Sequence, residues 1–221
     1  MGRSTDWHYD SDWSRVNADR AMVLHTVTEP TISSTDELDA PQLRRCAELV
    51  FDAGRGYYDL IEAERGLVEV QIQKQLGRPG TALQNIFFAL IGSNVAGLHA
   101  CISSEVLPFV MMEGTLQLLR GFERGVRRSF LSRLQRARPC LPALPESSLY
   151  LARMAVSESY QGLGIALALM EDFFGRRDFN GSYCLHCLTD NSRALDFYRG
   201  LGFEPFGEAM SGFLAMHRAA N

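Results

Sequence analysis

The sequence lacks long apolar runs, and this absence bears on where the protein works. None of its apolar stretches approaches the ~20 residues that a membrane-spanning helix needs. The first ten residues also lack the apolar core of a secretory signal. We therefore expect a cytoplasmic protein with no membrane partner.

Lysine is almost absent, and Lys74 is the only one in the chain. A P-loop needs a lysine and a Ser or Thr directly after its glycines, and Lys74 follows no such loop. The formal net charge is −4, and the pI is about 5.7. Bulk attraction to nucleic acid or to an anionic membrane is therefore not expected.

The five cysteines are odd in number and irregularly spaced, which favours reduced thiols over a disulfide framework. Cys184, His186 and Cys187 resemble half of a metal site, but a structural zinc ion needs four ligands and no second cluster follows. Residues 183–188 are also typical of a strand, on which Cys184 and Cys187 would face opposite sides. No metal is expected.

The composition is that of an ordinary globular domain, with 46% hydrophobic and 22% charged residues. Residues 1–22 are polar, lack clear periodicity and contain both tryptophans, Trp7 and Trp13. They predict a mobile tail, with docking on the domain or on a neighbouring subunit as the alternative. Residues 23–221 are expected to form one domain.

The most informative stretch runs from Leu149 to Ala168. Its first half is apolar and strand-like, residues 157–161 are polar and turn-forming, and small residues after Gln161 open a helix. Backbone N–H groups at such a helix start are unpaired, and the helix dipole adds partial positive charge. A pyrophosphate is the expected kind of ligand, and glycine is needed because a side chain would hold the phosphate away.

Two motifs in this region resemble signatures of the GNAT acetyltransferase superfamily. Gln161, Gly164 and Ala166 fit its coenzyme A-binding pattern, which is Arg or Gln, two residues, Gly, one residue, then Gly or Ala. About thirty residues later, residues 191–203 resemble the second signature, N-x-x-A-x-x-x-Y-x-x-x-G-F, in the expected order. The resemblance rests on residues 148–206, and upstream it is only one of pattern.

The resemblance implies a mixed, mostly antiparallel α/β sheet with helices on both faces, splayed where the fourth and fifth strands part. Periodicity alone predicts only a mixture of helices and strands. A cap at Ser34, Thr35 or Asp36 is expected for the first helix. The predicted strands are 23–33, 85–91, 95–103, the first half of 149–168, 181–188, 203–206 and 212–217. The predicted helices are 36–54, 57–75, the helix that begins after Gln161 and continues through Phe173, and 191–201.

The largest departure from a minimal family member is the segment 104–147, which separates the third and fourth strands. Apolar side chains from Met112 to Leu134 recur at helical spacing and predict a single stripe of about six turns. The arginines on its other face favour a solvated surface, and the alternative is an electropositive rim that gathers an anionic acceptor or the 3′-phosphate of coenzyme A. These arginines are Arg120, Arg124, Arg127, Arg128, Arg133 and Arg136.

The resemblance implies acetyl-CoA as the co-substrate. The thioester carbonyl would lie against the backbone N–H of Met154, which would favour negative charge developing on the carbonyl oxygen. The phenol of Tyr198 would protonate the departing thiolate. The implied binding residues are Met154, Val156, Gln161, Gly162, Leu163, Gly164, Ile165, Ala166, Asn191 and Tyr198.

The acceptor side carries weaker signals. The resemblance implies that the helices after the first strand form one wall of the acceptor site, so Tyr57, Tyr58 and Asp59 are candidate substrate-facing residues, with aromatic packing as the alternative. Tyr150, on the expected fourth strand, is a further candidate substrate-binding residue. No base is evident, because Tyr150 and Ala152, expected on the face shared with Met154, are not bases. The remaining possibilities are His99, Glu105, Glu158 and a water chain.

These residues predict an N-acetyltransferase in which a primary amine attacks acetyl-CoA directly in a ternary complex. The acceptor would be a small-molecule amine or a peptide N-terminus, and the protein a monomer or homodimer. Two alternatives stay open. One is a non-catalytic acyl-CoA-binding or sensing module, which the missing base favours and Tyr198 opposes, and the other is a transferase of a larger acyl group.

Overall fold

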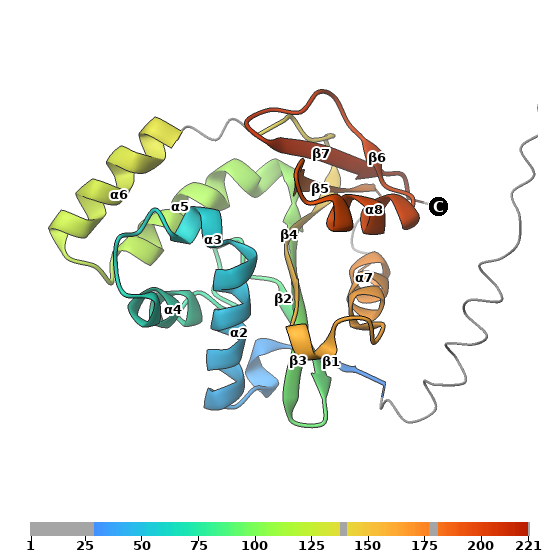
Figure 1. Ribbon diagram of the computed structural model, residues 1–221, viewed down its shortest axis with the longest axis horizontal. Helices are drawn as coiled ribbons and strands as arrows, with labels where there is room; N and C mark the ends of the chain where they lie inside the picture. Colours follow the sequence, from blue (N-terminus) through green and yellow to red (C-terminus); the bar gives the residue numbers. More distant parts are fainter. Residues whose placement is uncertain (1–28, 138–140, 177–180, 221) are drawn as a thin grey trace, which may run out of the picture.

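A computed structural model describes residues 29–137, 141–176 and 181–220. The segment 1–22, predicted to be a mobile tail, lies outside them, as does most of the strand expected at 23–33. Within the described residues, seven strands form one sheet in the order β1-β2-β3-β4-β5-β7-β6. Among these described strands, only the β4–β5 pair is parallel. The predicted mixed, mostly antiparallel α/β fold is confirmed (Figure 1).

The elements follow the predicted order, but residues 59–64 are not helical, so the single helix expected at 57–75 is wrong. The strands are β1 (Thr31–Ser33), β2 (Ile86–Ile91), β3 (Asn94–Ser103), β4 (Ser148–Val156), β5 (Ser182–Leu188), β6 (Glu204–Pro205) and β7 (Phe213–Arg218). The helices are α2 (Ala40–Ala53), α3 (Arg55–Tyr58), α4 (Arg65–Gln73), α5 (Leu107–Leu119), α6 (Arg124–Ala137), α7 (Ile165–Gly175) and α8 (Ser192–Gly200), with short 3-10 turns η1 (Thr35–Glu37), η2 (Ser104–Val106) and η3 (Glu158–Tyr160).

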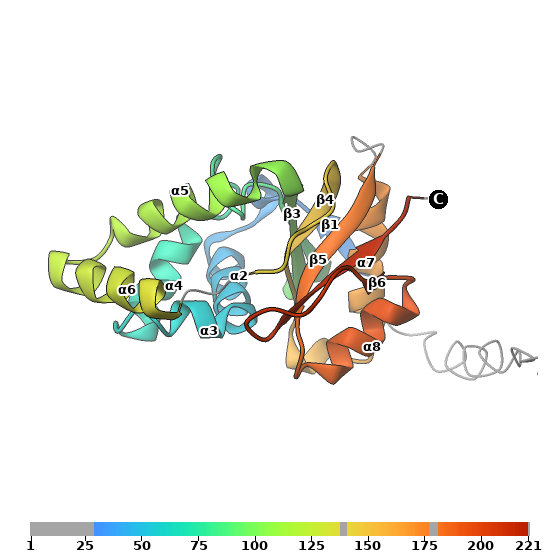
Figure 2. The ribbon, with the colours of Figure 1, turned by 90° about the horizontal axis from the view of Figure 1, so that it is seen from above.

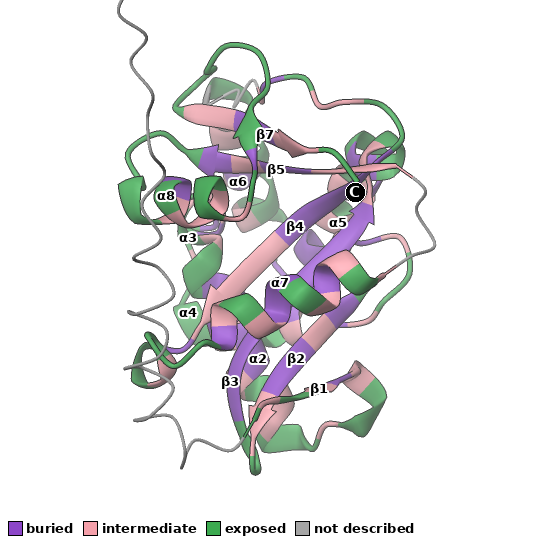
Figure 3. Cartoon of the chain, turned by 90° about the vertical axis from the view of Figure 1, so that its right-hand side faces the viewer, coloured by how far each residue is buried: buried purple, intermediate pink, exposed green. Residues whose placement is uncertain are grey.

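Helices cover both faces of the sheet. Helices α2 to α6 lie on one side, and α7 and α8 lie on the other, as Figures 1 and 2 show from two directions. Buried residues run along the middle strands between these layers (Figure 3). Phe88 and Ile102 belong to the core under α2 to α6, whereas Met170 and Phe173 belong to the core under α7 and α8.

Helix α2 begins later than the sequence indicated. Its N-cap is Asp39, whose side chain accepts from the Gln42 backbone N–H at 2.8 Å, while the Gln42 side chain accepts from the Asp39 N–H at 2.8 Å. This reciprocal capping box, with Pro41 in the first turn, fixes the start. The cap expected among residues 34–36 instead begins the 3-10 turn η1.

The segment after β3 does not form one continuous helical stripe, so that prediction is wrong. The helices α5 and α6 are separated by residues 120–123. Gly121 lies against α4, where an added Cβ would come within 2.0 Å of the Gln71 side chain. Met112 and Leu116 are 58% and 46% exposed, because the chain turns at this contact and only part of the apolar pattern faces the core.

Strand β4 contains a bulge that sets the direction of its last residues. Ala100 of β3 pairs with Arg153 of β4, and Cys101 of β3 pairs with Leu151 of β4. Ala152 is therefore left as an extra residue without a partner on β3. Before the bulge, β4 pairs with β5 only over residues 148–151. Beyond it the two strands part, so the predicted splay is confirmed.

The bulge corrects one expectation about side-chain direction. Tyr150 and Ala152 pack in the core under α2 to α6, whereas Met154 packs with the core under α7 and α8. They were expected to share a face, and they do not. A bulge adds one residue to a period of two, so simple alternation fails beyond it.

Candidate active site

The backbone of β4 presents free polar groups to the gap between β4 and β5. The Ser157 N–H donates to the Ala96 carbonyl at 2.9 Å, and His99 stands opposite Met154 in the same antiparallel register. Hydrogen-bonded and non-bonded pairs alternate along such a ladder. The N–H and C=O groups of Met154 and Val156 therefore point away from β3, into the gap where β5 has already departed.

The loop that follows ends in two glycines with left-handed backbone. Gly162 has φ of +79° and Gly164, the N-cap of α7, has φ of +81°. The first amides of the helix to donate to backbone are those of Leu167 and Ala168, both to the Gly164 carbonyl. An added Cβ at either glycine would meet open space. Glycine is thus required by the conformation, and the loop leaves its earlier amides available to an anion.

A cleft of about 780 Å³ lies beside this loop, between the end of β4 and helix α2. Arg45, Arg55 and Arg65 line one wall, and residues 154–159 with Gln161 line the other. Arg45 donates to the Ser157 hydroxyl at 3.0 Å, which ties α2 to the loop. All three arginines form ion pairs, Arg45 with Glu48 and the other two with Asp52, which also lines the cleft. The cleft therefore places paired arginines opposite the end of β4 and the first residues of the loop.

The predicted acid lies next to the predicted amide donor. Tyr198, on α8, donates its phenol to the Met154 sulfur at 3.7 Å. Burial raises the pKa of Tyr198 well above its usual range. The phenol is therefore protonated at neutral pH, and a rise in pKa makes it a weaker acid than an exposed tyrosine.

The other residues predicted to bind the cofactor divide into two groups. Gln161 is exposed and accepts from Arg193 at 2.9 Å, so α8 fixes the position of the loop. Leu163 also faces solvent, at 37% exposed. In contrast, Ile165 is buried in the core, and the Asn191 side chain caps α8 by accepting from the Ala194 N–H at 3.1 Å. The Asn191 side-chain oxygen therefore serves as the helix cap.

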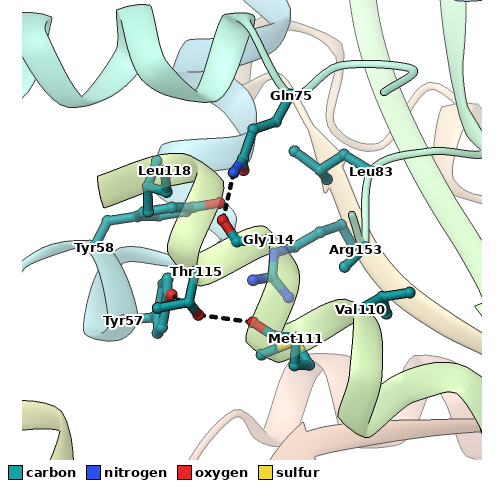
Figure 4. Close-up of a pocket in the computed structure, with 11 residues that line it drawn as sticks. Tyr57, Tyr58, Gln75, Leu83, Val110, Met111, Gly114, Thr115, Leu118 and Arg153 are labelled. Carbon is teal, nitrogen blue, oxygen red and sulfur yellow. Dashed lines mark hydrogen bonds between the residues drawn. The ribbon is translucent and has the colours of Figure 1, made fainter. Parts of the chain in front are cut away.

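The three predicted acceptor-side tyrosines separate. Tyr57 and Tyr58 line a second, small cavity, shown in Figure 4, together with Arg153 from β4. Tyr150 instead bonds His186 Nδ1 at 3.2 Å, and His186 bonds the Pro142 carbonyl through Nε2 at 2.9 Å. Burial raises the pKa of Tyr150 to about 12 and lowers that of His186. Sequence reasoning missed Arg153, whose direction depends on the bulge.

His99 is removed from the set of possible bases. It is fully buried and bonds Asp172 on α7 through Nε2 at 2.6 Å. Burial by itself would raise the pKa of Asp172, but the hydrogen bonds from His99 and Arg176 hold it below its usual value. This cluster joins α7 to β3 and has no access to the cleft. Of the other candidates, Glu158 lines the cleft and Glu105 accepts from Ser147 elsewhere.

Comparisons with known proteins agree on the family. Residues 133–205 match the acetyltransferase (GNAT) domain family. No curated protein sequence matches the chain. This match covers both motifs, so it agrees with the resemblance drawn from them, and no subfamily is assigned.

Solved structures agree on the fold. A structure described as an acetyltransferase has a TM-score of 0.62 at 17% identity and covers 86% of this chain and 100% of its own. An N-acetyltransferase from Staphylococcus aureus Mu50 has a TM-score of 0.61 at 17% identity, covering 86% and 99%. A protein described as histone acetyltransferase HPA2 and related acetyltransferase from Corynebacterium glutamicum has a TM-score of 0.54 at 16% identity, covering 88% and 98%.

Proposed function

We propose that the protein transfers an acetyl group from acetyl-CoA to a primary amine, which attacks directly while both substrates are bound. The observation that carries this proposal is the gap beside β4. There the backbone groups of Met154 and Val156 lack a strand partner, and the glycine loop closes one end. These groups fit a ligand that brings an amide-rich arm and a pyrophosphate, as coenzyme A does.

The chain would contribute hydrogen bonds and position. Acetyl-CoA, when bound, supplies a thioester carbonyl that an amine can attack. The Met154 N–H would donate to the carbonyl oxygen as negative charge develops on it, a kind of interaction worth about 3 kcal/mol in other acyl transfers. Tyr198 would donate its phenolic proton toward the departing sulfur. Holding both substrates in one cleft would supply much of the rate by proximity.

The raised pKa of Tyr198 bears on how that proton moves. A thiol has an ordinary pKa of about 8.5, below that of any tyrosine, so full transfer from this phenol is unfavourable and becomes more so with burial. Tyr198 would therefore act mainly as a hydrogen-bond donor to the sulfur. This favours a moderate catalytic contribution over a large one.

Titration calorimetry with coenzyme A and with acetyl-CoA tests the cofactor half of the proposal. We expect dissociation constants in the micromolar range, since several loop amides are free to bind the pyrophosphate. A thiol-release assay with acetyl-CoA and a set of primary amines tests the chemistry. Tight binding without amine-dependent release would instead support an acyl-CoA-binding module, and absence of heat at millimolar ligand would overturn the proposal.

The same assay addresses the acyl group. Succinyl-CoA and acetyl-CoA should be compared at equal concentration with the same amines. We expect faster release from acetyl-CoA, and a preference for the larger acyl group would overturn the acetyl assignment while leaving the transferase in place.

A further inference from the structure

Arg153 enters a small cavity on the far side of β4 from the α7 loop. The cavity measures about 30 Å³ and is bounded by residues of α3, α5 and β4 and of the segment between α4 and β2. In Figure 4 the guanidinium points from β4 toward Gly114 and Thr115, with Tyr57 and Tyr58 beyond them. Tyr57, Thr115 and Arg153 are half-buried, so solvent reaches this place. The cavity has room for about two water molecules, or for a small group of similar size.

The charge of Arg153 has no counter-charge in the part of the chain that the structure describes. No described carboxylate lies within ion-pair distance of it. Its Nη1 donates to the Ala152 carbonyl at 2.7 Å, and its Nε is buried without a hydrogen-bond partner. Among the other half-buried arginines, Arg133 pairs with Glu62 and Arg176 with Asp172, whereas Arg218 lies over the Phe174 ring.

The groups around Arg153 do not replace a carboxylate. The Thr115 hydroxyl donates to the Met111 carbonyl at 2.7 Å and shares a second bond of 2.7 Å with the Tyr57 phenol. The Gly114 carbonyl accepts from Gln75 at 2.6 Å. Burial raises the pKa of Tyr57 to about 12 and also raises that of Tyr58, while the charge of Arg153 and its hydrogen bond to the Tyr58 phenol oppose the second rise. Both phenols are therefore neutral, and a half-buried cation faces neutral walls. Such a cation is costly unless an anion joins it.

We propose that this pocket binds a carboxylate of the acceptor, so that the acceptor is an amine that also bears a carboxylate, as amino acids do. This inference rests on the proposed acetyl transfer. Arg153 would hold the carboxylate by charge-assisted hydrogen bonds, a geometry that guanidinium groups favour. The next residue, Met154, presents its N–H to the gap, so both substrates would meet at adjacent positions of one strand.

The experiment compares amines that differ only in the anionic group. Wild-type protein, Arg153→Gln and the control Arg44→Gln, whose arginine is exposed on α2, are assayed with glycine, β-alanine and larger amino acids against the matching amides and aminophosphonates. We expect the carboxylates to exceed the amides in kcat/KM by about 10- to 100-fold in wild type and in Arg44→Gln, the range for a hydrogen bond to a charged group. The preference should vanish in Arg153→Gln, mainly through KM.

A second readout does not depend on turnover. The melting temperature is measured with each amino acid and each amide, and a rise with carboxylates alone should occur in wild type and be lost in Arg153→Gln. If Arg153→Gln fails to fold, Arg153→Lys replaces it and should give an intermediate preference, because it keeps the charge and loses the planar fork.

The outcomes separate this inference from the proposed function. Coenzyme A binding and amine acetylation with equal rates for acids and amides would overturn the carboxylate pocket and leave the transferase intact. A carboxylate-specific thermal shift that needs Arg153, without any coenzyme A binding, would support the carboxylate pocket and overturn the proposed acetyl transfer. No thermal shift with any amino acid and no acid preference would overturn the inference, as would stronger recognition of aminophosphonates.

Discussion

The two sides of β4 after its bulge recognise ligands by different means. On the gap side, Met154 and Val156 offer backbone groups, and the loop at 162–164 offers more. On the other side, Arg153 offers a side chain to a pocket completed by residues of α3 and α5 and of the segment between α4 and β2. A backbone site needs glycines in a short local pattern, while the pocket needs particular side chains from distant segments. The first kind is visible in a sequence motif, and the second is not.

The largest effect should come from the gap side, with Gly164→Val. Valine is β-branched and strongly disfavoured at a φ of +81°, so the loop should change shape although the added side chain meets no neighbour. We expect coenzyme A binding to fall below detection by calorimetry. Gly175→Val is the matched control, since Gly175 ends the same helix, has open space and does not have positive φ. Normal binding by Gly164→Val would remove the loop from the site.

Removing the phenol of Tyr198 should have the next largest effect. Tyr198→Phe loses one oxygen and keeps the ring contacts with Phe197 and Phe203. We expect kcat to fall about 100-fold, the low end of the range for acid catalysis, with little change in acetyl-CoA affinity. Tyr183→Phe is the control, because that phenol donates to the Phe174 carbonyl at 2.8 Å away from the gap. A Tyr198→Phe variant that keeps more than about half of wild-type turnover, when chemistry limits the rate, would mean that Tyr198 only packs.

Acid should loosen the gap side before the pocket side, because Asp172 anchors α7. Its pKa is lowered in the folded state, so its contribution to stability is present above the unfolded value of 3.8 and is lost as pH falls through the folded pKa. Asp172→Asn should lower the free energy of unfolding by about 2 kcal/mol at pH 7, the middle of the range for hydrogen bonds to a charged group, and flatten its dependence on acid pH. Urea unfolding measures the loss.

Amide hydrogen exchange then shows which face of the sheet is destabilised by Asp172→Asn. Protection should fall in α7 and remain in α5, since Asp172 contacts His99 and Arg176 and not the pocket. Asp196→Asn, an exposed carboxylate on α8, serves as the control and should change little. Equal loss of protection on both sides of the sheet would contradict the separation.

The smallest effect is expected from the exposed arginines of α6. Replacing Arg124, Arg127 and Arg128 together by Gln should raise the KM of an anionic acceptor by about threefold at low salt, and by less at high salt, because exposed charges are screened. Acetyl-CoA affinity should not change, since the helix follows α5 on the pocket side (Figure 2). Steady-state kinetics at two ionic strengths measure both constants. Equal losses for both substrates would place α6 next to the cofactor instead.

The sequence predicted what depends on local patterns. The strand, loop and helix around Gly164, the hairpin of β2 and β3 and the helix bearing Tyr198 all follow from short-range spacing. The extra residue at Ala152 could not be predicted, because nothing in an apolar strand pattern marks which residue is left unpaired. The pocket of Arg153 could not be predicted either, since its walls come from residues 57–118 and meet β4 only through tertiary packing.

The bulge at Ala152 also has a mechanical consequence. Arg153 and Met154 are joined by one peptide bond, so the backbone positions that would carry the carboxylate anchor and the amide donor keep a fixed spacing. Movements of α5 or of the glycine loop would change how substrates enter, but they would not stretch this interval. The strand would then make the enzyme selective for the length of chain between the amine and the carboxylate of the acceptor.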